Sequence, residues 1–466
     1  MALSNTTLGT LMSSLDSNIV LIALPTIARN LPHTSLLELL WVLLGYQLVT
    51  ASVLVNFGRL ADMFGRVKLY NLGFAVFTAG SALCSAAQSG DQLVAFRMIQ
   101  AVGSAFLFSN SAAILTDAFP PGERGRALGV NQVAIVIGSV TGLVLGGVLT
   151  TAAGWRSIFW VNIPIGVFAT LWAHFRLKEL GEIRESQRID LVGNVVFAGG
   201  LASMLTGITL YALSAITGRV AIFLLTLGGC LLALFIYVEG RVKHPMFDLS
   251  IFKIRMFAAG NAAILLNSLA RGAASLVLVI YLQGPTMELS PLQAGIYLTP
   301  ISASLALFGP ISGYLSDKYG PRWIATLGLL VSCAGFILLT FLGTHITFTG
   351  LLVPLVLIGS GMGIFASPNR ASIMNAAPPA KRGLAAGTST TLTNAGNTFS
   401  LGLAFLILTS STSTKNLEQI FLGSSNLGDA PWIPQFISSI HRVFLVSSAI
   451  LLLAIIPSIL RGQKNS

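Results

Sequence analysis

Fourteen apolar segments, each long enough to cross a membrane as a helix, constrain the fold more than any other feature of this sequence. A helix needs about 20 mostly apolar residues to cross the hydrocarbon core of a bilayer. The segments are 8–28, 37–57, 68–88, 91–116, 127–150, 157–177, 189–211, 217–238, 256–282, 292–315, 322–342, 349–371, 384–410 and 439–460. Only 9% of the residues are Asp, Glu, Lys or Arg, which is too few to cover the surface of a soluble protein. The sequence therefore predicts an all-α protein in a lipid bilayer, with 14 transmembrane helices.

The basic residues are distributed unevenly between the two sides of this predicted bundle. With the N-terminus placed in the cytoplasm, 20 Lys and Arg residues fall on the inner side and five on the outer side. The asymmetry follows the positive-inside rule, and an even number of helices returns the C-terminus to the cytoplasm. We therefore expect a multi-pass protein of the cell (plasma) membrane with both termini inside. No basic run is interleaved with aromatic residues as a nucleic-acid surface would require, so nucleic acid is not an expected partner.

The connections between the predicted helices are short. The longest are 178–188 and 239–255 on the inner side and 411–438 on the outer side. No basic n-region precedes the first apolar segment, so we expect that segment to remain as a helix rather than to be cleaved.

Two short motifs each occur twice, at nearly the same separation. Residues 58–66 are similar to residues 313–322, which lie 255 positions later, and residues 120–129 are similar to residues 378–387, which lie 258 positions later. Both copies have the same orientation, so the halves form a parallel repeat about an axis along the membrane normal. We predict two six-helix bundles related by this pseudo-two-fold, with an inserted helix pair between them. The predicted bounds are 1–180 for the N-terminal bundle, 181–250 for the inserted helices 7 and 8, and 251–466 for the C-terminal bundle.

The repeated loop carries a resemblance to a known family. Residues Gly58–Lys68 resemble the signature loop of the major facilitator superfamily, and Gly313–Arg322 is the second copy. Three further stretches are similar to motifs of the branch with 14 helices, the drug:proton antiporters: 15–25, 97–103 and 155–164. The sequence departs from the branch at Ala101, where a glycine is usual, and at Leu143, where the motif of the fifth helix has a proline.

The resemblance covers nearly the whole chain, and it implies the major facilitator fold. It also implies a secondary active transporter that exports small amphipathic organic compounds by alternating access, coupled to protons, as in multidrug efflux and drug resistance. One alternative is an importer or facilitator for a dedicated metabolite, which Leu143 favours slightly. A remote alternative is a polytopic membrane enzyme, but the outer loop 411–438 contains only two carboxylates and no histidine.

Three ionisable side chains lie in the hydrocarbon core, away from the ends of the predicted spans: Asp16, Arg97 and Arg271. Each costs about 2.5–3.5 kcal/mol to insert, so each is a candidate for function. Asp16 is the only carboxylate well inside the membrane, and we expect it to bind and release protons; the alternative is a fixed ion pair with an arginine. Arg97 keeps its proton. The resemblance implies that Arg97 tunes a nearby carboxylate, and the alternative is an arginine that snorkels toward the helix end.

Arg271 lies 255 positions after Asp16, at the offset of the repeated loops. We therefore expect the two side chains to face a shared substrate cavity, as a pair or as its two poles. The alternative is that Arg271 bonds to carbonyls within its own bundle. Other polar residues in the spans are candidates for substrate contact, although each could equally form hydrogen bonds between helices. They are Asn18, Gln47, Asn131, Asn267, Gln283 and Asn394.

Two groups of residues are candidates for conformational roles. The resemblance implies that the signature loops form a latch between the halves: Gly58, Asp62, Gly65, Arg66, Gly313, Asp317, Gly320 and Arg322. The motif of the fifth helix contains Gly138, Gly142, Gly146 and Gly147. The first three recur every four residues and form a face for close helix packing. Either packing alone or a hinge or sealing role accounts for them.

No motif indicates enzyme chemistry or a cofactor. The three cysteines, Cys84, Cys230 and Cys333, have no metal-binding spacing, and no Walker loop for ATP is present. We therefore expect no catalytic residues, no metal and no cofactor. The expected partners are a small-molecule substrate, protons and the lipid bilayer, and we expect a monomer.

Overall fold

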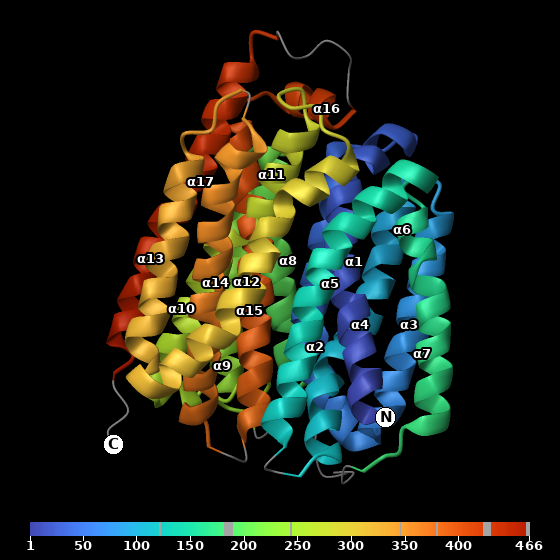
Figure 1. Cartoon of the computed structure of the whole chain (residues 1–466), viewed down its shortest axis with the longest axis vertical. Helices are drawn as coiled ribbons and strands as arrows, with labels where there is room; N and C mark the ends of the chain where they lie inside the picture. Colours follow the sequence, from blue (N-terminus) through green and yellow to red (C-terminus); the bar gives the residue numbers. More distant parts are fainter. Residues whose placement is uncertain are drawn as a thin grey trace. The chain divides into compact units, whose positions relative to one another are not determined.

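The computed structural model describes residues 1–120, 123–180, 190–242, 245–344, 346–378, 381–422 and 430–462. All regular elements in these ranges are helices, as the sequence predicts (Figure 1). Parts of the predicted connections 178–188, 239–255 and 411–438 lie outside the described residues, as do two residues in each copy of the 120–129 motif.

Among the described residues, 14 segments are long and apolar enough to cross a membrane, which confirms the predicted number. Twelve consist of one helix: α1 (Ala2–Asn30), α2 (Leu36–Phe64), α3 (Arg66–Ala86), α4 (Gly90–Ala118), α5 (Arg124–Ala153), α8 (Leu191–Ala212), α9 (Gly218–Glu239), α12 (Pro291–Tyr319), α13 (Pro321–Leu339), α14 (Phe348–Ala376), α15 (Arg382–Thr409) and α17 (Ile433–Leu460). The other two are each divided into two helices: α6 (Ser157–Trp160) with α7 (Asn162–Arg176), and α10 (Arg255–Arg271) with α11 (Ala274–Gln283).

Two short elements were not predicted. They are the 3-10 helix η1 (Ile251–Lys253) and the helix α16 (Thr414–Leu422). Several spans are also longer than predicted: α2, α4, α12 and α14 have 29 residues each. At 1.5 Å per residue such a helix is about 44 Å long, so it extends past the hydrocarbon core.

Local sequence signals fix the ends of equivalent helices in both halves. Capping boxes start α2 at Ser35 with Glu38 and α12 at Ser290 with Gln293, again 255 residues apart. Each box satisfies backbone N–H groups that the first helical turn leaves free. The same two helices end at Gly65 and Gly320, whose φ angles are +103° and +84°. A positive φ strains residues that have a Cβ, which explains the glycines at these two turns.

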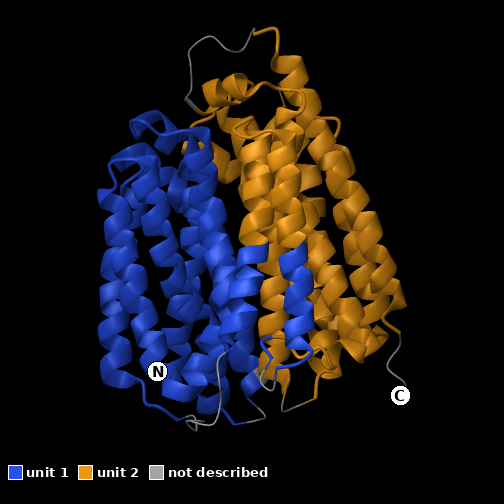
Figure 2. Ribbon diagram, turned by 180° about the vertical axis from the view of Figure 1, so that it is seen from behind, with its two compact units in different colours: residues 1–200, 230–246 blue, residues 201–229, 247–466 orange. Residues whose placement is uncertain are grey.

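The chain forms two compact units (Figure 2). Unit 1 comprises residues 1–200 and 230–246, and unit 2 comprises residues 201–229 and 247–466. In unit 1, α1 packs on α5, α2 and α3 pack on α4, and α7 packs on α3. In unit 2, the corresponding pairs are α10 with α15, α12 and α13 with α14, and α17 with α13. The same helix pairings therefore recur inside each unit, as the sequence repeat predicts.

The inserted helices contribute to both units. The division between units falls inside α8, after Gly200, and inside α9, before Cys230. The predicted bounds near residues 180 and 250 remain predictions.

Candidate functional site

The Asp16 carboxylate lies at the centre of a buried polar network within unit 1. Asp16 comes from the middle of α1 and is fully buried. Its Oδ2 accepts a hydrogen bond from Arg97 Nη1 at 2.6 Å, and the two side chains form an ion pair. Its Oδ1 accepts hydrogen bonds from Gln100 Nε2 and Asn162 Nδ2, both at 2.9 Å. Three donors thus converge on one carboxylate, an arrangement that suits its ionised, acceptor-only form.

Arg97 points into unit 1 rather than toward the end of α4. Only 1% of its surface is exposed, so it does not snorkel. Besides Asp16, its Nη1 donates to Gln100 Oε1 at 2.5 Å and its Nε to the Val42 carbonyl at 3.5 Å. Its guanidinium carbon lies 4.1 Å from the centre of the Tyr46 ring and 5.9 Å from that of Phe159. Aromatic faces stabilise a cation that has been removed from water.

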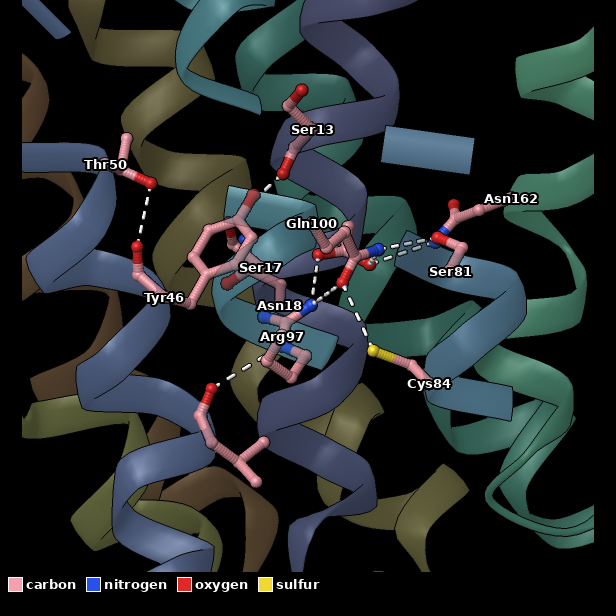
Figure 3. Close-up of polar contacts among 12 residues, drawn as sticks. Ser13, Ser17, Asn18, Tyr46, Thr50, Ser81, Cys84, Arg97, Gln100 and Asn162 are labelled. Carbon is pink, nitrogen blue, oxygen red and sulfur yellow. Dashed lines mark hydrogen bonds and ion pairs between the residues drawn. The ribbon is translucent and has the colours of Figure 1, made fainter. Parts of the chain in front are cut away.

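Gln100 holds the network together from one helical turn beyond Arg97. Its Nε2 also donates to Ser81 Oγ on α3 at 2.6 Å. Figure 3 shows how Arg97 and Gln100 of α4 converge with Ser81 of α3 and Asn162 of α7. The close approach of α3 to α4 at this level depends on Gly80, where a Cβ would lie 2.7 Å from the Gln100 Cα.

Asp16 and Arg97 are predicted site residues, whereas Gln100, Asn162, Ser81 and Tyr46 were not predicted from the sequence. For Gln100 a signal was available, because residues three apart share a helix face and Gln100 follows Arg97 at that spacing. Asn162 lies at the start of α7, and its proximity to Asp16 results from tertiary packing that no local pattern encodes.

The glycine face of α5 packs directly against the helix that carries Asp16. A Cβ at Gly138 would lie 2.6 Å from the Leu11 carbonyl oxygen, and one at Gly142 would lie 2.6 Å from that of Leu15. A Cβ at Gly146 would meet Ile19 at 2.9 Å. Gly147 is also buried. The observed contact is the close packing that was one of the two interpretations of this motif, and it fixes the position of α1 beside α5.

The first signature loop forms a charged cluster within unit 1. Arg66 donates to Asp62 at 2.8 Å and to both oxygens of Asp117 at 2.8 Å. The carboxylate of Glu179, which the sequence analysis did not single out, accepts hydrogen bonds from the backbone N–H groups of Arg66 and Val67 at 3.0 and 2.9 Å. Glu179 therefore caps the N-terminus of α3 from a distant part of the chain. Gly58 has open space around it.

The second signature loop is built differently. Among the described residues of unit 2, none forms an ion pair with Asp317, and Arg322 lies 4.9 Å from the ring of Trp323 with its Nε buried and unpaired. A Cβ at Gly313 would lie 2.8 Å from Ser367 Oγ. The latch role of both loops remains a prediction.

The remaining predicted substrate contacts fall into two groups. Asn18 and Asn131 form local or interhelical hydrogen bonds within unit 1, to the Ser14 carbonyl at 3.0 Å and to Ser111 Oγ at 2.9 Å. Gln47 also lies in unit 1 and has interactions of its own. Unit 2 contains the others: Asn267, Arg271, Gln283 and Asn394, of which Gln283 is engaged in interactions. Their contact with substrate remains a prediction.

Sequence comparisons find relatives that cover most of this chain. The profile of the Major Facilitator Superfamily matches residues 6–237 and 260–464. The chain is 33% identical over 398 residues to the riboflavin transporter RibZ of Clostridioides difficile (strain 630), covering 85% of each chain. It is 31% identical over 418 residues to the multidrug resistance protein Stp of Mycobacterium tuberculosis (strain CDC 1551 / Oshkosh), covering 89% of this chain and 77% of the relative.

The fold also matches solved structures. One is the crystal structure of a bacterial homologue of the human lysosomal transporter Spinster, in an inward-facing and unoccupied conformation. It aligns with a TM-score of 0.69 at 16% identity, covering 99% of this chain and 96% of that chain. At this identity the likeness shows the fold alone.

Proposed function

The chain belongs to the major facilitator superfamily, whose members are transporters and not enzymes, and from that premise we propose that it exports small amphipathic organic compounds in exchange for protons. Asp16 takes up and releases the coupling proton, and Arg97 responds to its charge. The polar residues of the spans line the substrate cavity, and the signature loops close its cytoplasmic side. The protein acts as a monomer in the cell membrane, with both termini in the cytoplasm.

The buried Asp16–Arg97 pair is the observation that carries this proposal. Both side chains are at most 1% exposed, so neither charge can be solvated without a structural change. When Asp16 takes up a proton, Arg97 loses its only anionic partner among the described residues and keeps only the neutral oxygens of Gln100 and Val42. An unpaired buried charge is strongly destabilising, so protonation favours a different arrangement of these helices. Proton binding is thereby linked to conformation.

The similarity to the multidrug resistance protein Stp supports drug-like compounds as the class of transported molecule. A second candidate is transport of one dedicated metabolite, and the relative RibZ favours it. RibZ is a riboflavin transporter, and the similarity covers 85% of both chains, a larger share of the relative than for Stp. Leu143, in place of the motif proline, agrees with this second candidate.

Substrate-driven proton release tests the proposal. The purified protein is placed in liposomes with an internal pH dye and an inside-acid gradient, and a panel of cationic, neutral and acidic amphiphiles, with riboflavin, is added. We expect some compounds to dissipate the gradient with the wild type but not with Asp16→Asn. Asp91→Asn, an exposed carboxylate at the start of α4, is the matched control and should behave as the wild type.

Two other outcomes distinguish the alternatives. If riboflavin is the single compound of the panel that is transported, the result favours a transporter dedicated to one metabolite. Movement of labelled compounds with no proton flux would refute antiport and leave Asp16 as a structural ion pair.

A further inference from the structure

The membrane span formed by α10 and α11 is interrupted in its middle, at Arg271. Helix α10 ends at this residue, and α11 begins at Ala274 after Gly272 and Ala273. The N–H of Ala273 donates to Ser400 Oγ on α15 at 2.9 Å. A Cβ at Gly272 would lie 2.6 Å from the Asn397 Cα, so α15 packs closely against the interruption. The first turn of α11 therefore follows Arg271 in the chain after only these two residues.

Among the described residues of unit 2, the Arg271 side chain has no hydrogen-bond or ion-pair partner. Its Nε is buried without a hydrogen bond, and no described residue of unit 2 bonds or pairs with its guanidinium. The predicted alternative, bonding to carbonyls of its own bundle, is therefore not observed in unit 2. By contrast, the buried Arg461 in the same unit donates to Asn369 Oδ1 at 2.6 Å and to the Ser458 carbonyl at 3.1 Å.

The membrane-spanning helices of unit 2 offer no carboxylate in mid-span to neutralise Arg271. In helices α10 to α15 and α17 the only acidic residue is Asp317, in the last turn of α12. Carrying an arginine in the membrane costs about 2.5–3.5 kcal/mol on insertion scales. Its presence at mid-span without a partner in its unit therefore requires another reason.

Comparison with unit 1 shows what is unusual about this position. Asp16 lies beside the contact of α1 with Gly142 of α5. Arg271 lies beside the contact of α10 with Ser400 of α15, and Ser400 follows Gly142 by 258 residues, the offset of the second repeated motif. The two charges thus occupy equivalent places in their units. In unit 1 the Asp16 carboxylate accepts hydrogen bonds from three donors, whereas the Arg271 guanidinium has no partner among the described residues of unit 2.

We infer that Arg271, with the N-terminal turn of α11, binds an acidic group of the transported compound, such as a carboxylate, a sulfonate or an ionised imide. A guanidinium binds such groups through paired charge-assisted hydrogen bonds, and the N-terminus of a half-helix adds positive potential in interrupted transporter helices. Asn267, one turn earlier on α10, has no side-chain hydrogen bond to a described residue of unit 2 and adds a neutral donor on the same face. This inference rests on the proposed transport function and narrows its substrate class.

The test compares acids with matched neutral compounds. Binding of an acidic amphiphile and of its methyl ester is measured in detergent by equilibrium binding, and transport of both is measured in liposomes. We expect the wild type to bind the acid more tightly than the ester. Arg271→Gln should weaken acid binding about tenfold or more and change ester binding by less than about twofold. Arg271→Lys should fall between them, because it keeps the charge but loses the fork of donors.

The control is Arg219→Gln, an exposed arginine of unit 2, which should leave both affinities unchanged. An acid-to-ester preference that is the same in the wild type and in Arg271→Gln overturns the inference, and so does a wild-type preference for the ester. If Arg271→Gln does not fold, two other measurements test the inference. They are the acid and ester affinities of Arg271→Lys, and the thermal stabilisation of the wild type, which should be stronger with the acid than with the ester. Proton-coupled transport of neutral or cationic compounds only would overturn the inference while the proposed function stands. Preferential acid binding without any transport would support the inference about Arg271 and refute the proposed transport function.

Discussion

The pair formed by Asp16 and Arg97 makes a quantitative prediction about stability. Its atoms are 2.6 Å apart, and the side chains are 0% and 1% exposed. Removing one member of a buried pair leaves the other charge unpaired, which costs about 3–5 kcal/mol. In Asp16→Asn the amide offers one acceptor oxygen where the carboxylate offered two, so at least one of the three donors faces an NH2 group. In Arg97→Gln the carboxylate keeps only its two amide donors.

The double variant Asp16→Asn/Arg97→Gln removes both charges together. Neutral replacements of a whole buried pair are often tolerated. We therefore expect the double variant to be less destabilised than the sum of the single variants by about 3 kcal/mol or more. Reversible unfolding in mixed micelles with an increasing fraction of SDS measures each free energy.

A matched control comes from Arg66 and Asp117 in the same unit. This pair has a distance of 2.8 Å but side-chain exposures of 21% and 22%. We expect a coupling of about 1 kcal/mol or less there, because water competes for both charges. Additivity of the Asp16 and Arg97 variants within about 0.5 kcal/mol would refute the reasoning, since it would mean that the buried pair contributes no more than two independent side chains.

Three further predictions concern packing, capping and pH. Gly142→Ala should lower the free energy of unfolding by about 1–3 kcal/mol, because its Cβ would lie 2.6 Å from a carbonyl oxygen of α1. Gly129 lies on the same helix with open space around it, so Gly129→Ala should not lower the free energy of unfolding. Unfolding of both variants in SDS checks this. Glu179→Ala should cost about 1 kcal/mol, as loss of a helix cap does, and should speed hydrogen exchange at the start of α3 while leaving α13 unchanged. Partial burial opposes ionisation of Asp248, but hydrogen bonds from Lys381 and Ser250 outweigh it and hold the Asp248 pKa below its usual value. This stabilisation is therefore complete above about pH 4 and is lost as pH falls through the lower, folded pKa. Asp248→Asn should be less stable than the wild type by on the order of 0.5 kcal/mol near neutral pH, and a difference that persists at the most acid pH would contradict the assignment.

Much of the fold can be predicted from patterns along the sequence. The span count follows from hydrocarbon thickness, and the repeat of two motifs predicts the helix pairings found in each unit. The turns at Gly65 and Gly320 belong to the repeated loops, and their positive φ angles explain why glycine stands at both. The interruption between α10 and α11 was not predicted, because it depends on a contact with Ser400 that is distant in sequence.

The candidate site was only half accessible from the sequence. A charged residue within a long apolar segment is easily recognised in the sequence, which is why Asp16 and Arg97 were predicted. The sequence allowed an ion pair of Asp16 with an arginine but did not select Arg97 over Arg271 as the partner, because the depth and rotation of the helices decide which side chains meet. The amide donors Gln100 and Asn162 are equally hidden, since a neutral polar residue in a membrane helix has many possible reasons to be there.

Every described hydrogen-bond partner of Asp16 lies in unit 1, between residues 97 and 162, whereas Arg271 lies in unit 2 and has no partner among the described residues of that unit. The two repeats therefore differ in how the charge at this equivalent place is satisfied within its own unit. Under the proposed function, changes in the second repeat can alter which molecule is carried without touching Asp16, the residue proposed to carry the coupling proton. If the two roles are divided in this way, laboratory selection for a new cargo should enrich changes around Arg271 rather than around Asp16.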